Sequence, residues 1–121
     1  MNILLVEDNI QFNTTITNFL ILKNYKVTSL HNEENIISHI NEIQFDLFLI
    51  DLDSENINSL NLVNHIRKKN LLTPILIITH SLELEKYKSL IQHVNTLYIN
   101  KPFHLNELEV MIENILTKTN K

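Results

Sequence analysis

The chain has 121 residues, a formal net charge of -4, no cysteine and no glycine. This length suffices for one domain with an ordinary core, and 44% hydrophobic and 20% charged residues are usual for a globular protein. The acidic balance argues against nucleic-acid binding by this domain itself, and the lack of glycine excludes dinucleotide fingerprints and P-loops.

Targeting signals and membrane segments are not found in the sequence. No apolar stretch approaches the roughly 18 residues of a membrane helix, and no signal peptide opens the chain. The absence of cysteine rules out disulfides and thiolate chemistry. We therefore expect a cytoplasmic protein that does not associate with membranes.

The order of the apolar segments predicts five strands and five helices in strict alternation. Short β-branched apolar runs are typical of buried parallel strands, and apolar residues at helical spacing mark the helices. The expected strands are 2–6, 26–30, 46–51, 74–79 and 96–100, and the expected helices are about 9–23, 33–43, 57–69, 83–93 and 104–118. Five such units predict a single α/β domain over residues 1–121, a doubly wound parallel sheet with helices on both faces. The polar strand 26–30 should lie at an edge.

Each expected helix carries an apolar stripe that should face the core. The stripes are Phe12, Ile16, Phe19 and Leu20; Ile36, Ile37, Ile40 and Ile43; Leu60, Val63 and Ile66; Leu84, Tyr87 and Ile91; and Leu105, Leu108, Ile112 and Ile115. Asparagine is the next-best residue after glycine for ending a helix in the left-handed conformation. Asn24, Asn70 and Asn95 stand where helices should end, and we expect them to take this role.

Polar residues follow four of the five strands at the points where the strands end. These residues are Glu7 and Asp8, Asp51, Thr79, and Lys101 with Pro102. The carboxyl ends of parallel strands share one edge of the sheet, where such folds place their sites. Three acids, a hydroxyl and a lysine should therefore converge from positions scattered over most of the chain.

The expected cluster has the chemistry of a phosphorylatable metal site. Three neighbouring carboxylates raise one another's pKa values unless cations compensate. Mg²⁺ takes oxygen ligands and often bridges to a phosphoryl group, and Lys101 adds a positive charge suited to phosphate. Asp51 would then be an ionised nucleophile directed at phosphorus, with catalysis resting on positioning and electrostatics.

With this order and spacing, the chain resembles the receiver domains of bacterial two-component response regulators over almost its full length. The resemblance rests on Glu7-Asp8, Asp51, Thr79, Lys101-Pro102-Phe103, and Tyr98 three residues before the lysine. It implies a flavodoxin-like (βα)5 fold with strand order 2-1-3-4-5. It also implies a signalling switch rather than an enzyme, one that promotes its own phosphorylation and autodephosphorylation.

The resemblance implies a phosphoacceptor and a metal site. Asp51 would accept the phosphoryl group, and Glu7, Asp8 and Asp51 would hold Mg²⁺ or Mn²⁺. The backbone carbonyl of Asp53 would complete the protein ligands of the metal. The simpler interpretation of Glu7 and Asp8 is an N-cap with first-turn charges on the first helix.

The resemblance also implies the residues of the switch. Thr79 would hydrogen-bond to the phosphoryl group and Lys101 would form an ion pair with it. The Thr79 hydroxyl would move toward phosphate and the Tyr98 ring would fill the vacated space. The Lys101–Pro102 peptide is expected to be cis. A half-buried strand tyrosine is also common without such a role.

The sequence departs from the family pattern around the phosphoacceptor. The family usually has proline where Glu55 stands, glycine where Ser59 stands, and a small residue where His80 stands. Loss of the proline should loosen the loop after Asp51. We expect Asp53 and His80 to modulate the phosphorylation and dephosphorylation rates by partly screening the aspartyl phosphate.

The other histidines show no spacing typical of metal ligands, and we expect them to face solvent. They are His31, His39, His65, His93 and His104.

Two other functions compete with a phosphorylated switch. A phosphorylation-independent module for protein interaction could retain the fold. An enzyme, either a flavin binder or an aspartyl-phosphate phosphohydrolase, fits less well. Glu7 and Asp8 would repel a flavin phosphate, and the acidic pair Asp51 and Asp53 follows the third strand rather than the first, with no substrate-binding cap.

By resemblance, the partners are a sensor histidine kinase, docking near Phe12 and Thr15, and a C-terminal effector domain outside this chain. Such an effector could bind DNA and regulate transcription. The surface formed by 83–93, 96–100 and 104–118 would transmit the switch to the effector. The same surface allows a homodimer, although it lacks the charged residues typical of the winged-helix branch of the family.

Overall fold

The computed structural model describes residues 1–32, 36–69, 72–80 and 95–119. The strands are β1 (Asn2–Val6), β2 (Lys26–Leu30), β3 (Leu47–Asp51), β4 (Ile75–Thr79) and β5 (Thr96–Asn100). The helices are α1 (Ile10–Leu22), α2 (Ile36–Glu42), α3 (Ser59–Lys69) and α5 (Leu105–Thr119). Each strand lies within one residue of its expected position. The helix expected over 83–93 falls outside the described residues.

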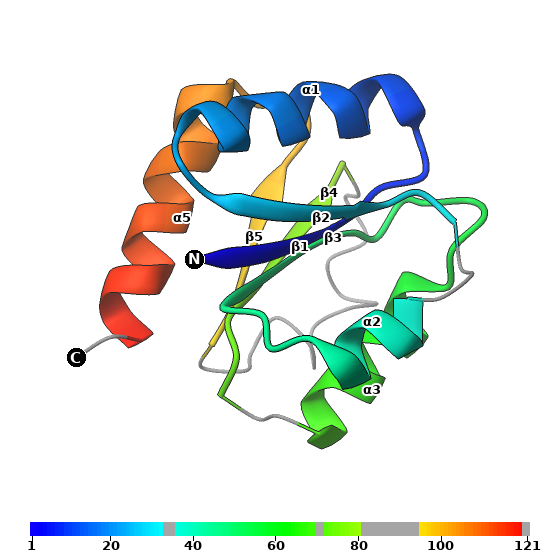
Figure 1. Cartoon of the computed structure of the whole chain (residues 1–121). Helices are drawn as coiled ribbons and strands as arrows, with labels where there is room; N and C mark the ends of the chain where they lie inside the picture. The colour runs from blue at the N-terminus through cyan, green and yellow to red at the C-terminus, as the bar shows by residue number, and fades with distance from the viewer. Residues whose placement is uncertain (33–35, 70–71, 81–94, 120–121) are drawn as a thin grey trace.

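The five strands form one parallel sheet in the order β2-β1-β3-β4-β5, which confirms the expected topology and the edge position of β2. In Figure 1, α1 and α5 lie on one side of the sheet and α2 and α3 on the other. Successive strand residues alternate between the two faces, so Ile3 and Leu5 join one core cluster while Leu4 and Val6 join the other. The parallel arrangement brings all five carboxyl ends to one edge.

Local signals explain where α1 begins and ends. The side chain of Asn9 accepts a hydrogen bond from the Phe12 amide at 3.0 Å and caps the helix. Glu7 and Asp8 are therefore not the N-cap. Asn24 follows the helix with φ at 71°, the left-handed conformation expected for it.

Several expectations about helix faces are wrong. Leu60 is exposed and Leu62 is buried instead, because the inner face of α3 runs through Ser59, Leu62, Val63 and Ile66. Of the α2 stripe, Ile36 is buried and Ile40 half-buried, whereas Ile37 and Ile43 are exposed. This helix has only seven residues and ends before Ile43.

Asn95 is expected to end the helix over 83–93, which lies outside the described residues. Its side-chain amide donates to the Leu72 carbonyl at 2.9 Å. Asn70 and the stripe Leu84, Tyr87 and Ile91 lie outside the described residues.

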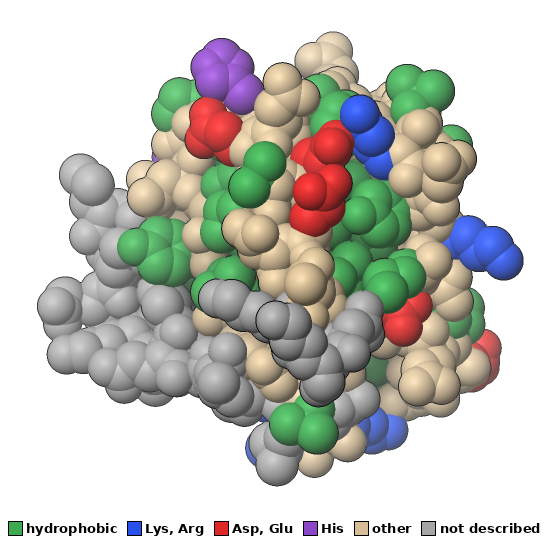
Figure 2. Space-filling view, turned by 90° about the vertical axis from the view of Figure 1, so that its left-hand side faces the viewer, with side chains coloured by type: hydrophobic (Ala, Val, Ile, Leu, Met, Phe, Trp, Pro, Cys, Tyr) green, Lys and Arg blue, Asp and Glu red, His purple; other side chains and the backbone are tan. Residues whose placement is uncertain are grey.

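On the side where α5 lies, the described residues form no large region of one charge (Figure 2). Figure 2 shows acidic and basic side chains interspersed among hydrophobic and uncharged polar ones on that face. Over the described ranges, the helices are all too short or too polar to span a bilayer.

Candidate functional site

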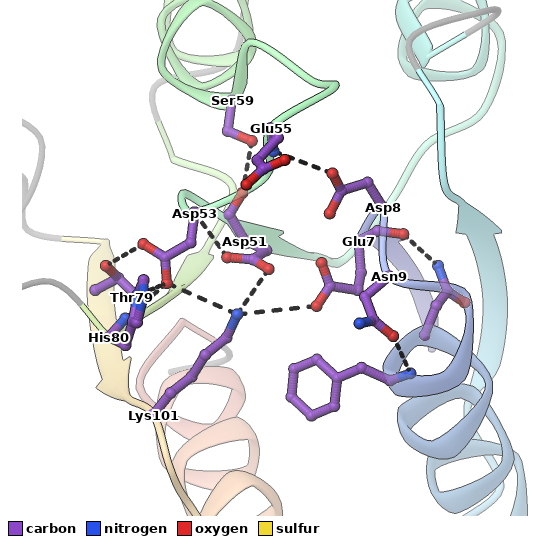
Figure 3. A network of polar contacts seen from close by, with 12 residues as sticks. Glu7, Asp8, Asn9, Asp51, Asp53, Glu55, Ser59, Thr79, His80 and Lys101 are labelled. Carbon is purple, nitrogen blue, oxygen red and sulfur yellow. Dashed lines mark hydrogen bonds and ion pairs between the residues drawn. The ribbon is translucent and has the colours of Figure 1, made fainter.

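The polar residues that end the strands converge at the carboxyl edge of the sheet. A cavity of about 730 Å³ at this edge is lined by Glu7, Asp8, Asp51 and Lys101 among others. Figure 3 shows the side chains of Glu7, Asp51, Asp53 and Lys101 directed toward one another from the ends of β1, β3 and β5. The expected convergence of acids, hydroxyl and lysine is thus present in the fold.

Asp51 lies at the centre of this cluster. Its side chain is almost fully buried at the end of β3. One carboxylate oxygen accepts a hydrogen bond from the Asp53 amide at 2.8 Å, and the other accepts one from Lys101 Nζ at 2.8 Å. The backbone carbonyl of Asp51 accepts a hydrogen bond from the buried Ser59 hydroxyl at 2.6 Å. Both the side chain and the backbone of this residue are therefore held in place.

Lys101 lies among three carboxylates. Its Nζ is 2.8 Å from Asp51, 3.7 Å from Asp53 and 3.9 Å from Glu7. Burial disfavours the ammonium, but its hydrogen bond to Asp51 and the three negative charges outweigh burial and raise the pKa of Lys101. The lysine is thus charged at neutral pH. Its peptide bond to Pro102 is cis.

Glu7 is the most perturbed acid of the site. Its side chain is buried after β1, and no group in the described parts of the chain hydrogen-bonds to its Oε2. Burial first, and then the neighbouring Asp51 carboxylate with which it can share a proton, raise the pKa of Glu7 to about 8, although Lys101 opposes the shift. At neutral pH this carboxyl group is protonated unless another cation approaches.

Asp8 faces a different neighbour from the other acids. Its Oδ2 accepts hydrogen bonds from the backbone amides of Glu55 and Asn56, at 3.0 and 3.2 Å, and from the Asn56 side chain at 3.3 Å. Figure 3 shows this contact between Asp8 and the loop that follows β3. A proline at position 55 would have no amide hydrogen to donate. The Glu55 amide therefore makes a hydrogen bond to Asp8 that the proline expected from the resemblance would exclude.

The acidic residues fit a divalent cation. Glu7, Asp8 and Asp51 each offer one oxygen, and these three atoms lie within 4.8 Å of one another. Opposite ligands of Mg²⁺ are roughly 4.2 Å apart, so a small side-chain movement would suffice. The Oε2 atom of Glu7, unpartnered among the described residues, is the kind of buried carboxyl oxygen that such an ion satisfies. The cluster could therefore hold a metal.

The side chain of Asp53 was not expected to contact Thr79. Its Oδ1 accepts a hydrogen bond from Thr79 Oγ1 at 2.9 Å, and its Oδ2 accepts one from the His80 amide at 2.7 Å. The His80 ring nitrogen Nδ1 lies 2.5 Å from the same Oδ2. Sequence reasoning considered only the backbone carbonyl and a general screening effect at this position.

Tyr98 lies farther along the sheet on β5, opposite Ile77 in register. It is half-buried and packs against the core cluster on the α2 and α3 side of the sheet. Thr79 pairs with Asn100, two residues beyond Tyr98. The proposed switch residues thus occupy adjacent strands.

Two buried polar residues that support the site were missed by sequence reasoning. The side chain of Asn13 donates to the backbone carbonyls of Glu7, at 3.0 Å, and Leu30, at 3.4 Å, and it accepts a hydrogen bond from Ser29. Ser59 holds the Asp51 carbonyl. A polar residue within an otherwise apolar helix face was the available signal for Asn13. For Ser59, the departure from glycine gave no indication of a hydrogen bond.

The histidines are less exposed than expected in two cases. His31 and His104 are exposed, whereas His39 and His65 are half-buried on α2 and α3. The expectation that all five face solvent is therefore wrong for this pair. His93 lies outside the described residues.

Comparisons with known proteins agree with this geometry. A family model described as response regulator receiver domain matches residues 3–113. The response regulator ArlR of Staphylococcus epidermidis is 32% identical over 117 residues, which are 97% of this chain and 53% of ArlR. The transcriptional regulatory protein CiaR of Streptococcus pneumoniae is 28% identical over 121 residues, 100% of this chain and 54% of CiaR. The chain thus spans about half the length of these relatives.

Solved structures show the same fold. A two-component response regulator from Clostridium difficile superposes with a TM-score of 0.87 at 22% identity, covering 100% of this chain and 99% of that one. The chemotaxis response regulator CheY4 of Vibrio cholerae has a TM-score of 0.82 at 21% identity and covers 94% and 97% of the two chains. At these identities the likeness concerns the architecture.

Proposed function

Because this chain belongs to the response regulator receiver domains, the phosphoacceptor domains of two-component signalling, we propose that Asp51 is the residue that accepts the phosphoryl group. The observation that carries the proposal is the 2.8 Å ion pair between Lys101 and the buried carboxylate of Asp51, within a cluster of further acids. We take residues 1–121 as one such domain.

The chemistry follows from the contacts of Asp51. A carboxylate oxygen attacks the phosphorus of the donor, and a new oxygen–phosphorus bond forms. The bond from phosphorus to the donor atom breaks, and its electron pair stays with the donor. Lys101 lies close enough to neutralise developing charge on the phosphoryl oxygens, since its Nζ already contacts Asp51. The acyl phosphate is reactive, and autodephosphorylation by water would return the carboxylate.

We assign the metal site to Glu7, Asp8, Asp51 and the backbone carbonyl of Asp53, for Mg²⁺ or Mn²⁺. When bound, the ion would neutralise negative charge on the transferring group. Glu7 must lose its proton to act as a ligand, so metal binding and deprotonation are linked. Asp8 would present its carboxylate to the ion from a position where its Oδ2 accepts hydrogen bonds from the amides of Glu55 and Asn56.

The switch would begin at Thr79. Its hydroxyl lies at the end of β4 and donates a hydrogen bond to the Asp53 carboxylate. Lys101 Nζ lies 3.7 Å from the same carboxylate. Phosphorylation would draw this hydroxyl toward the phosphoryl group, and the half-buried Tyr98 ring on the neighbouring strand would repack. The Thr79 side chain already has a partner in Asp53, so the movement requires that contact to change.

The partners follow from the family rather than from this chain alone. We propose a sensor histidine kinase as phosphodonor, an effector domain as the recipient of the switch, and a cytoplasmic location. One relative, CiaR, is a transcriptional regulatory protein, and this chain spans about half of the length of CiaR and of ArlR. Dimerisation through the surface of 83–93, β5 and α5 stays a prediction, and its first segment lies outside the described residues.

Phosphorylation of Asp51 tests the proposal directly. Incubation with acetyl phosphate and Mg²⁺ should add the mass of one phosphoryl group to the intact protein, and Asp51→Asn should abolish this addition. Glu42→Gln, an equal loss of charge at an exposed position on α2, should leave it unchanged. Persistent phosphorylation of Asp51→Asn would disprove the assignment.

The competing function is a phosphorylation-independent interaction module. It predicts a folded protein that neither binds Mg²⁺ nor takes up phosphorus. Mg²⁺ titration followed by tyrosine fluorescence separates the two functions. A saturable change that weakens in Glu7→Gln supports the metal site, and no change together with no phosphorylation supports the module.

A further inference from the structure

The carboxylate of Asp53 occupies a position between the phosphoacceptor and the end of β4. Its two oxygens contact the Thr79 hydroxyl, the His80 amide and the His80 ring, at 2.9, 2.7 and 2.5 Å. The ammonium of Lys101 lies 3.7 Å away. Figure 3 shows Asp53 beside Asp51, with both acids directed toward Lys101. The side chain is only 14% exposed.

These contacts are those that an oxyanion on Asp51 would need. A phosphoryl group carries several anionic oxygens, and hydroxyls, backbone amides and ammonium groups are its usual donors. Lys101 already contacts the Asp51 carboxylate at 2.8 Å, so an anion attached to Asp51 would lie within the same small space. In the described structure, two of these donors, the Thr79 hydroxyl and the His80 amide, are hydrogen-bonded to the Asp53 oxygens instead.

We infer that the Asp53 carboxylate is an internal competitor of the phosphoryl group, which holds Thr79 and His80 before phosphorylation and must withdraw for Asp51 to react. This inference rests on the proposed function of Asp51 as phosphoacceptor. It makes Asp53 a positioning residue that slows phosphorylation by occupying donors and by repelling the incoming anion.

The withdrawal requires only side-chain rotation. The amide of Asp53 is hydrogen-bonded to Asp51 Oδ1 at 2.8 Å, and that bond is independent of the Asp53 side chain. The cavity of about 730 Å³ is lined by Asp53 and His80, and it gives the carboxylate room to turn toward solvent. Metal binding by the backbone carbonyl and release of the side chain are therefore compatible.

Two substitutions separate charge from hydrogen bonding. Asp53→Asn keeps the shape and one acceptor oxygen but loses the charge, and Asp53→Ala removes both. With each protein saturated with Mg²⁺, the rate of phosphorylation by acetyl phosphate should rise about tenfold in Asp53→Ala, the effect of removing charge-assisted hydrogen bonds that must break. Asp53→Asn should show a smaller increase.

A second measurement distinguishes competition from a merely structural role. The affinity for beryllofluoride, a phosphoryl analogue, is measured by tyrosine fluorescence. It should be highest in Asp53→Ala, intermediate in Asp53→Asn and lowest in the wild type. Asp46→Asn is the matched control, because this exposed acid hydrogen-bonds to the Asn2 amide at the opposite edge of the sheet. It should change neither quantity.

The outcomes keep the two proposals distinct. If the wild type is phosphorylated and folded Asp53→Asn and Asp53→Ala are no faster and bind beryllofluoride no more tightly, the inference about Asp53 is wrong and the function of Asp51 stands. If the wild type takes up no phosphorus and binds no beryllofluoride, both proposals fail together.

Discussion

Two partly buried cations lie at opposite edges of the sheet, and they have contrasting neighbours. Lys101, at the carboxyl edge, lies among the carboxylates of Glu7, Asp51 and Asp53. Arg67, which reaches from α3 to the amino edge, donates to neutral acceptors instead. These are the backbone carbonyls of Thr73 and Asn95, at 2.6 and 3.1 Å, and the hydroxyl of Thr96, at 2.7 Å.

The difference in neighbours gives opposite effects on proton affinity. Burial lowers the pKa of Arg67 to about 10. Burial acts in the same direction on Lys101, but the acids around it reverse the shift. A guanidinium among neutral acceptors joins α3 to the starts of β4 and β5, which is a structural role. One lysine among several acids leaves excess negative charge, and this edge can therefore accept a further cation.

The largest expected effect is at the carboxyl edge. Lys101→Met should slow phosphorylation of Asp51 about 100-fold, because one preorganised donor to developing charge is lost. Mg²⁺ should still bind, since the acids remain. The measurement is the rate of mass gain with acetyl phosphate at saturating Mg²⁺. The control is Lys26→Met, at an exposed position on β2. Equal phosphorylation rates in Lys101→Met and Lys26→Met would show that Lys101 does not assist phosphorylation.

Substitution of Arg67 at the amino edge should change the stability of the fold and leave phosphorylation unchanged. Arg67→Met should lower the free energy of unfolding by about 2 kcal/mol, because three buried or half-buried acceptors lose this donor. Urea unfolding measures the loss, and Lys68→Met, at the exposed neighbouring position, serves as control. Phosphorylation of the folded variant should match the wild type. A change in phosphorylation without a change in stability would contradict the structural role.

A smaller effect concerns the pH dependence of Glu7. Without metal, the folded protein binds this proton more tightly than the unfolded chain, because the pKa is raised from 4.5 to about 8. The stability contributed by protonation is therefore fully present below about pH 4.5 and is lost as pH rises to about 8.

Glu7→Gln should remove this slope. Between pH 5 and pH 8 in EDTA, the free energy of unfolding of the variant should fall less than that of the wild type, measured by urea unfolding. Added Mg²⁺ should stabilise the wild type at pH 8 more than the variant, since only the carboxylate is an anionic ligand. Parallel pH profiles of the two proteins in EDTA would show that Glu7 does not carry the raised pKa.

The strands and the membership of the site could be predicted because their signals are local. Apolar runs located the five strands to within one residue, and four of the five runs are followed by a polar residue of the site. Helix faces were harder. The stripe chosen for α3 included Leu60, but the helix begins at Ser59 and turns Leu62 inward. A shift of one or two positions is small in the sequence and changes which side chain is buried.

The supporting polar contacts could not be predicted, because they join residues far apart in the chain. Asn13 contacts the carbonyls of Glu7 and Leu30, and Ser59 contacts that of Asp51. Neither residue type indicates a buried hydrogen bond by itself. Their partners are set by the paths of the loops.

The sequence alone determined the parallel sheet and the meeting of acids, hydroxyl and lysine at its carboxyl edge, since hydrophobic periodicity is a property of neighbouring residues and parallel strands end together. Only the tertiary structure decided where each carboxylate points. Asp8 turns to the amide of Glu55, and Asp53 turns to Thr79 and His80. These choices depend on side-chain rotamers and on donors 26 to 47 residues away, which no local pattern records.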